Sequence, residues 1–185
     1  MMDVSGSMGW RQKYLCRAFF WLLNQFVRTK YQHVEVVYII HHSTAREVNE
    51  DQFFHTMESG GTACSSAYNL ALEIITDRFP PEAWNAYAFH MSDGDNWGED
   101  DPIAIELANR LCEMCNLFGY GQVSGWGDDS LYNEEEVSWN GLFETLQVVQ
   151  NEHENMALVR IRNEEDVYPQ FREMLEGEKV KGGVH

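Results

Sequence analysis

The chain has 185 residues, which is within the usual range for a single domain. Hydrophobic residues make up 44% of it and aromatic residues 13%, so the composition supports a packed core and excludes a disordered chain. The formal net charge of −17 makes nucleic acid and anionic membranes poor partners, because their phosphates would be repelled.

The sequence contains no recognisable targeting or anchoring segment. No apolar run approaches the roughly 20 residues that cross a bilayer, and the N-terminus lacks the basic and apolar regions of a signal peptide. Four cysteines are too few for a disulfide scaffold and fit a reducing compartment, so we expect a cytoplasmic protein. The pair in Cys112-Glu-Met-Cys115 has no second pair to complete a zinc site, and we interpret both cysteines as ordinary helix positions.

Apolar periodicity along the chain predicts strands that alternate with helices. In chain order we expect a helix over 9–31, a strand within 33–42, a short edge strand over 45–48, a helix over 65–79, a strand over 84–91, a helix over 102–116, a strand over 117–123, a helix over 139–151, a strand over 157–162 and a helix over 167–175. This alternation predicts an α/β fold with a doubly wound, mostly parallel sheet and helices on both faces.

The same pattern suggests the domain limits. Residues 1–176 are expected to form one domain, interrupted by an acidic, glycine-containing loop over 124–137 that is long for a packed domain and is expected to be flexible or functional. Residues 177–185 are expected to form a frayed C-terminal tail.

Three loops at predicted strand ends contain clustered oxygen side chains. They read D-V-S-G-S at 3–7, G-G-T at 60–62 and S-D-G-D at 92–95. Because the carboxyl ends of parallel strands share one edge of a sheet, these loops are expected to meet there. Alternate positions of the first loop can face one side, and oxygen ligands suit Mg²⁺, Mn²⁺ or Ca²⁺. The predicted metal ligands are Asp3, Ser5, Ser7, Thr62 and Asp93.

The charge of this ligand set suggests a function. Two carboxylates at most neutralise a divalent ion and hydroxyls add no charge, so the ion could accept a further carboxylate from an acidic residue of a protein partner. Ordinary turn chemistry is the alternative, since Ser7 and Thr62 both precede helices and could cap them. Asp95 is a weaker candidate. It is expected either to interact with the metal ligands without binding the ion itself or to be a solvated acid of the turn.

The three motifs, in this order, resemble the metal-ion-dependent adhesion site of von Willebrand factor A (VWA) domains. That family has a doubly wound α/β fold with a divalent ion at the top of the sheet. The resemblance implies that the first motif, Thr62 and Asp93 hold the ion. It has one departure: an apolar strand should lead into the first motif, whereas only Met1 and Met2 precede it here. The chain is therefore expected to be a fragment or to have a shortened central strand.

A narrower resemblance covers more of the chain. The segments at 40–49, 58–62, 78–85 and 87–97 are similar to the bacterial YeaH/YhbH family. That family has a VWA-like domain in its C-terminal half, after a charged N-terminal segment. The resemblance implies a stress-response or sporulation-associated protein, with a PrkA-type serine kinase system as a candidate partner by family association.

Two other functions are considered. A metal-dependent hydrolase would need a general base, and only His41 or His90 could serve; neither a nucleophile elbow nor a phosphate-binding loop is present, so we expect no enzyme and no catalytic residue. Adjacent His41 and His42 should point to opposite faces, and His90 is expected to be packed.

The third function is a module whose metal serves folding only. The tryptophans beside the loops could anchor a partner, although packing is the preferred interpretation: Trp97, Trp126 and Trp139.

Overall fold

A six-stranded sheet forms the centre of the computed structural model, which describes residues 1–56, 58, 60–124 and 141–176. The strand order is β3-β2-β1-β4-β5-β6. All neighbouring strands run parallel except β2 and β3, which form an antiparallel edge pair. The strands are β1 (Met2–Asp3), β2 (Tyr38–His41), β3 (Ala45–Val48), β4 (Tyr87–Ser92), β5 (Leu117–Val123) and β6 (Met156–Ile161).

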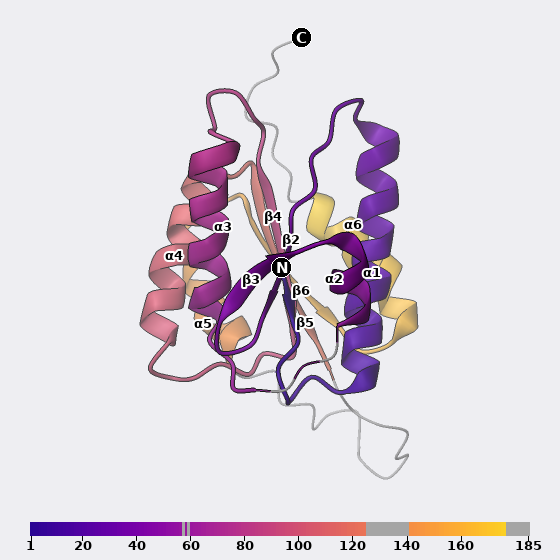
Figure 1. Ribbon diagram of the computed structural model, residues 1–185. Coiled ribbons are helices and arrows are strands. Elements are labelled where there is room, and N and C mark those ends of the chain that lie inside the picture. The colour runs from indigo at the N-terminus through magenta and orange to yellow at the C-terminus, as the bar shows by residue number, and fades with distance from the viewer. Residues whose placement is uncertain (57, 59, 125–140, 177–185) are drawn as a thin grey trace.

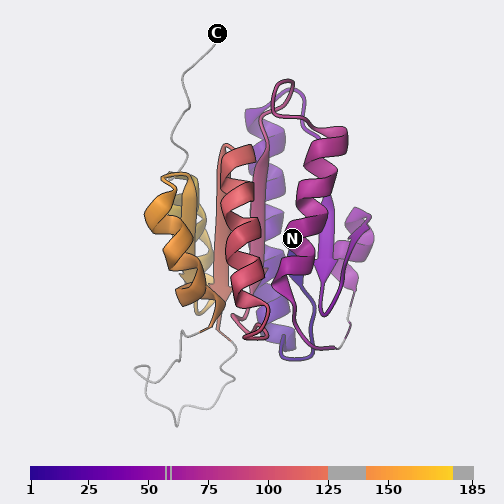
Figure 2. The same ribbon diagram turned by 90° about the vertical axis from the view of Figure 1, so that its left-hand side faces the viewer.

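Helices cover both faces of this sheet (Figure 1). One layer consists of α3, α4 and α5, which stand side by side in Figure 2, and the other consists of α1, α2 and α6. Each layer buries its own apolar core against the sheet. The helices are α1 (Trp10–Lys30), α2 (Glu50–His55), α3 (Cys64–Arg78), α4 (Asp101–Met114), α5 (Leu142–Glu152) and α6 (Glu164–Glu176).

The predicted α/β fold is therefore confirmed, with helices on two faces of a mostly parallel sheet. None of the helices in the described ranges combines the length and the apolarity needed to cross a bilayer. The acidic loop predicted at 124–137 lies, apart from Ser124, outside the described residues, and so does the tail predicted at 177–185.

Several elements differ from the sequence-based prediction; α6, for example, begins at Glu164 rather than at Val167. The strand expected within 33–42 includes only Tyr38–His41, the four residues that pair with the edge strand β3. The expected strand at 84–91 begins later, at Tyr87. The short helix α2 was not predicted; it starts with a capping box in which the Asn49 side chain accepts a hydrogen bond from the Gln52 backbone.

The central strand β1 is short but fully buried. Met2 pairs with Ile40 of β2 and with Met91 of β4, so β1 joins the two halves of the sheet. A largely apolar hollow of about 540 Å³ lies towards the amino ends of the strands, where Met1, Val37 and Phe89 help to line it. The oxygen-rich loops lie at the opposite, carboxyl ends.

Candidate functional site

The first loop leaves β1 with its acid buried and its serines turned towards one another. Asp3 is fully buried at the end of the strand. The backbone N–H of Ser5 donates a hydrogen bond to Asp3 Oδ1 over 2.7 Å, and the hydroxyls of Ser5 and Ser7 lie 3.1 Å apart. The Ser5 and Ser7 side chains of the first motif therefore contact each other, and the Asp3 carboxylate contacts the Ser5 backbone.

The third loop brings a second carboxylate to the same place. Asp93 directly follows β4, and its carboxylate accepts hydrogen bonds from the Ser7 side chain and from the Asp95 backbone N–H, the latter over 3.0 Å. Gly94 has φ 94°, a left-handed conformation that glycine adopts without strain. The Gln122 side chain donates to the Asp93 carbonyl over 2.9 Å, which ties the turn to β5.

The second loop is joined to both of the others by backbone hydrogen bonds. The N–H of Gly6 donates to the Gly60 carbonyl over 3.1 Å, and the N–H of Trp97 donates to the Thr62 carbonyl over 3.2 Å. Thr62 is buried, with 5% of its surface exposed. A side chain at Gly61 would overlap the Trp97 ring, so the close approach of these two loops requires glycine there.

The two carboxyl groups have unusual proton affinity. Burial raises the pKa of Asp3 from 3.8 to about 6, although hydrogen bonds from Ser5 lower it. Burial, followed by the charge of Asp3, raises the pKa of Asp93 to about 6 as well. The positive charge of Lys13, itself a buried residue, lowers the pKa of Asp3 and so lies within electrostatic reach. When both acids are ionised, Asp3, Asp93 and Lys13 together have a net negative charge, which a bound cation would balance.

One atom in particular fits a cation ligand. Asp3 Oδ2 is buried and has no hydrogen-bond partner among the described residues. A buried carboxylate oxygen without a partner is costly, and a bound cation would satisfy it. Asp3, Ser5, Ser7 and Asp93 are thus brought together by hydrogen bonds, and the Thr62 loop is fixed beside them. These residues fit a divalent cation with oxygen ligands.

Two further residues of this edge are exposed. Asp95 is solvent-exposed, and its charge raises the pKa of both Asp3 and Asp93, so it acts on the site from outside. Trp97 is 53% exposed while its ring contacts the Gly61 position, so it packs against the second loop and is still accessible to solvent. The other two tryptophans considered, Trp126 and Trp139, lie outside the described residues.

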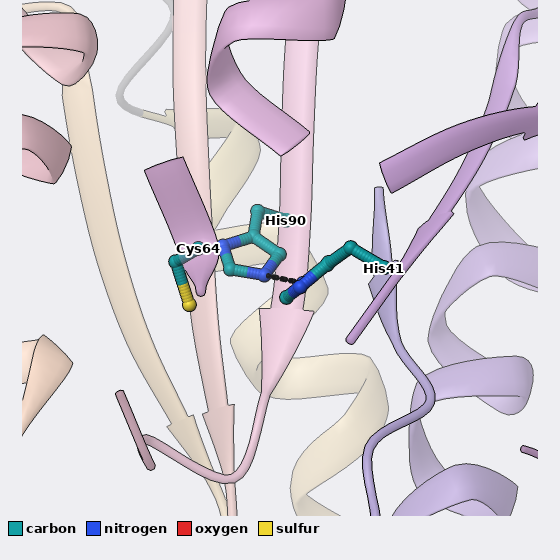
Figure 3. Close-up of side chains that lie close together, drawn as sticks. All are labelled: His41, Cys64 and His90. Carbon is teal, nitrogen blue, oxygen red and sulfur yellow. Dashed lines mark hydrogen bonds between the residues drawn. The ribbon is translucent and has the colours of Figure 1, made fainter. Parts of the chain in front are cut away.

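A second cluster lies in the interior near this edge (Figure 3). It consists of His41 at the end of β2, Cys64 at the start of α3 and His90 in β4, all three buried, with ligand atoms within 4.8 Å of one another. The Nε2 atoms of His41 and His90 lie 2.8 Å apart in a hydrogen bond, drawn dashed in Figure 3.

No pattern in the sequence connects these three residues. In the sequence, His41 stands next to His42 and suggests a pair with it. In the structure, the His42 side chain contacts Ser43 instead. The prediction that His90 is packed is confirmed. The remaining signal is weak: a histidine at the end of one strand, a histidine in the next long strand, and a cysteine two residues after Thr62. Cys112 lies in α4 and Cys115 caps its end, as expected for ordinary positions of that helix.

The fold and its three joined loops define the class: a VWA-like α/β domain. Residues 1–178 match the family described as "Protein of unknown function (DUF444)", and the chain belongs to that family. A UPF0229 protein of Ruminiclostridium cellulolyticum is 51% identical over 176 residues, which are 95% of this chain and 42% of that protein. A UPF0229 protein of Pectobacterium carotovorum is 39% identical over 181 residues, which are 97% of this chain and 40% of that protein. The chain thus spans about two fifths of these relatives.

Two solved structures share the fold. Proximal thread matrix protein 1 of the mussel byssus superimposes with a TM-score of 0.61 at 13% identity, covering 96% of this chain and 44% of that one. The manganese-loaded TRAP protein of Plasmodium vivax superimposes with a TM-score of 0.58 at 14% identity, covering 92% of this chain and 70% of that one. At such low identity the likeness concerns the fold alone.

Proposed function

We propose that this domain binds a divalent cation through its three loops and uses it to bind an acidic residue of a protein partner. The ligands are those that the sequence predicts: Asp3, Ser5, Ser7, Thr62 and Asp93. The observation that supports this function most directly is the buried Asp3 Oδ2, which lacks any partner in the described residues and lies in the loop where hydroxyl oxygens converge. Mg²⁺ and Mn²⁺ are the first candidates, since both accept oxygen ligands.

The charge balance favours association over hydrolysis. A bound divalent cation would supply an electrophilic position that a partner's carboxylate can occupy. Asp3 and Asp93 provide two negative charges, and nearby Lys13 offsets part of them. The hydroxyl ligands contribute none, so an incoming carboxylate is not repelled by an excess of fixed charge at the ion.

The surface beside the loops also suits a partner. Trp10, the first residue of α1, is 75% exposed directly after the first loop, and Trp97 is 53% exposed in the third. Exposed tryptophans are the side chains most enriched among residues that dominate binding energy at interfaces. The acidic charge of the chain would in addition steer basic surfaces towards this face.

A metal-dependent hydrolase ranks second because the two histidines considered as its general base are buried. His41 and His90, the two candidates, are fully buried and hydrogen-bonded to each other. Burial lowers the pKa of both imidazoles. A base must lie within reach of the water that it activates, and these side chains lie in the core.

The biological setting is proposed from family resemblance. The relatives compared above are bacterial, and the local segments that resemble the YeaH/YhbH family favour a role in stress response or sporulation, with a PrkA-type serine kinase system as a candidate partner. The proposed mechanism requires only that the partner present a carboxylate and fit an edge flanked by tryptophans.

Calorimetric titration with Mg²⁺ and Mn²⁺ tests the cation site. We expect one site per chain in the unmodified protein and at least a tenfold loss of affinity in Asp3→Asn and in Ser5→Ala. Glu99→Gln is the matched control, because Glu99 is an exposed acid close to the third loop. Undiminished, stoichiometric binding in Asp3→Asn would contradict the assignment of the ligands.

Partner binding is tested separately, with the protein immobilised and exposed to extracts in Mg²⁺ or in EDTA. The proteins that depend on the site should be lost both in EDTA and with Asp3→Asn, and retained with Glu99→Gln. For each such partner, replacement of one surface Asp or Glu by Ala should abolish binding. A partner set indifferent to both EDTA and Asp3→Asn would favour a purely structural role for the cation.

A further inference from the structure

The core cluster of His41, Cys64 and His90 is chemically unlike the carboxylate site. Two imidazoles and a thiol are the ligands that thiophilic transition metals select, whereas Mg²⁺ and Ca²⁺ select oxygen. The three side chains reach this point from three separate elements, β2, α3 and β4, and all are buried. We propose that His41, Cys64 and His90 form a second metal site, for a thiophilic closed-shell ion such as Zn²⁺ or Cu⁺.

The orientation of His90 supports this proposal. Its Nδ1 atom lies 2.9 Å from the Tyr68 hydroxyl, which leaves Nε2 facing His41. Metal-binding histidines characteristically have their second ring nitrogen fixed by a hydrogen bond of this kind, which sets the tautomer and the ring plane. Tyr68 is itself fully buried, so it holds the His90 ring in a defined orientation.

The position of Cys64 is also fixed. It is the first residue of α3, and its backbone N–H donates to the Asn96 side chain over 3.0 Å. The Asn96 amide in turn donates to Asp101 at the start of α4 over 2.8 Å. The cysteine is therefore held by the third loop and two helix starts rather than by a single flexible segment.

The distances are close to those of an occupied site. Two ligand atoms that bind one zinc ion tetrahedrally at about 2.0–2.1 Å lie about 3.3 Å apart. The two Nε2 atoms lie 2.8 Å apart, so their separation must grow by a few tenths of an ångström when an ion binds. The ligand atoms of all three residues lie within 4.8 Å of one another, so the longer distances in the cluster must shrink. A three-coordinate ion needs only these ligands, and a tetrahedral one would take water as its fourth.

Protons balance in the binding step. In the hydrogen-bonded pair, one histidine has its proton on Nε2; for both to bind an ion, that proton must move to Nδ1 of the same ring. The Cys64 thiol loses its proton to solvent as the metal–sulfur bond forms, so one proton is released for each ion bound. Burial raises the pKa of this thiol, which keeps it protonated until an ion arrives.

The site is tested with Zn²⁺ and Cu⁺ added to the purified protein, both in the folded state and during refolding so that burial does not block entry. We expect one ion per chain by metal analysis after dialysis, and at least a tenfold loss of affinity in Cys64→Ser. Cys16→Ser is the matched control, because Cys16 is equally buried but lies in α1 on the other face of the sheet. Asp3→Asn should retain this ion while losing Mg²⁺, which separates the two sites.

Co²⁺ gives a measurement that does not depend on whether Cys64→Ser folds. Unmodified protein and Cys16→Ser should both show a thiolate-to-cobalt charge-transfer absorption that Zn²⁺ displaces. Absence of that absorption in unmodified protein, together with no retained Zn²⁺ or Cu⁺, would overturn the proposal and leave His41 and His90 as a hydrogen-bonded core pair. Zinc binding that survives in folded Cys64→Ser would overturn it too.

Discussion

Asp93 owes part of its raised pKa to the negative charge of Asp3, which lies at the end of the adjacent strand β1. Burial is the larger cause, and both carboxyl groups have a pKa of about 6. Two acids that repel each other in a buried position destabilise the metal-free protein wherever both are ionised. A bound cation would supply the opposing charge and remove that cost.

Cation affinity should fall steeply in mild acid. The ionised carboxylates that a cation needs are present above about pH 7 and are lost as the pH falls through 6, because the folded-state pKa values lie above the ordinary 3.8. In the metal-free protein the same shift lowers the free energy of unfolding as the pH rises from about 4 to about 6. With two sites titrating, we expect Mg²⁺ affinity to drop about tenfold between about pH 7.5 and about pH 5.5. Calorimetry at constant ionic strength measures this; a constant affinity down to about pH 5 would contradict it.

Removal of Lys13 should strengthen cation binding. Lys13 is 4% exposed; burial lowers its pKa, and the charges of Asp3 and Asp93 partly oppose this, so its ammonium group interacts with the same carboxylates that a cation would bind. Lys13→Met should raise Mg²⁺ affinity several-fold in a calorimetric titration. Lys30→Met, at the other end of α1, is the control and should change nothing. An affinity for Mg²⁺ that falls in Lys13→Met would show that the lysine assists the site.

The junction of the second and third loops should tolerate no side chain at Gly61. A Cβ there would overlap the Trp97 ring, so Gly61→Ala should displace one of the two loops, weaken cation binding and lower the free energy of unfolding by about 1–3 kcal/mol. Gly98→Ala is a matched control, because a Cβ at Gly98 meets nothing within 4 Å. Chemical denaturation and calorimetry measure both effects, and equal behaviour of the two variants would argue against a tight junction.

Trp10 should affect partner binding without affecting the cation. Trp10 is 75% exposed beside the first loop, so Trp10→Ala removes contact area at the proposed interface but no ligand. We expect at least a tenfold weaker interaction with a cation-dependent partner and an unchanged Mg²⁺ titration. Trp21→Ala is the control, since Trp21 is 58% exposed further along the same helix. Equal losses in both variants would place the partner elsewhere.

Local sequence patterns predicted most of the fold, because most of the helices bury one apolar face and most of the strands are apolar runs. Leu117–Val123 is a continuous buried strand with the predicted bounds. The strand around Tyr38–His41 was predicted too long, because a run of β-branched residues does not reveal how many of them will pair with the edge strand β3. Helix α2, with six residues, is too short to show a periodic pattern.

The two clusters differ in how far sequence could reveal them. The predicted oxygen ligands occupy loops with recognisable local motifs, so the spacing of Asp3, Ser5 and Ser7 is enough to group them. The core cluster has no local motif: its members come from two strands and a helix, and each residue alone resembles a packed core position. Only the register of β2 against β1, and the place of β4 on the other side, bring His41 to His90.

His41 belongs to the core cluster through its ring and supports the first loop through its backbone. Its carbonyl accepts a hydrogen bond from the Val4 backbone N–H over 2.9 Å, inside the first loop, while its ring faces His90. A shift of the His41 backbone that accommodates one ion would therefore also move a support of the other. Any resulting coupling between the two binding equilibria is reciprocal by thermodynamic necessity: the factor by which one ion changes the affinity for the second is the factor by which the second changes the affinity for the first.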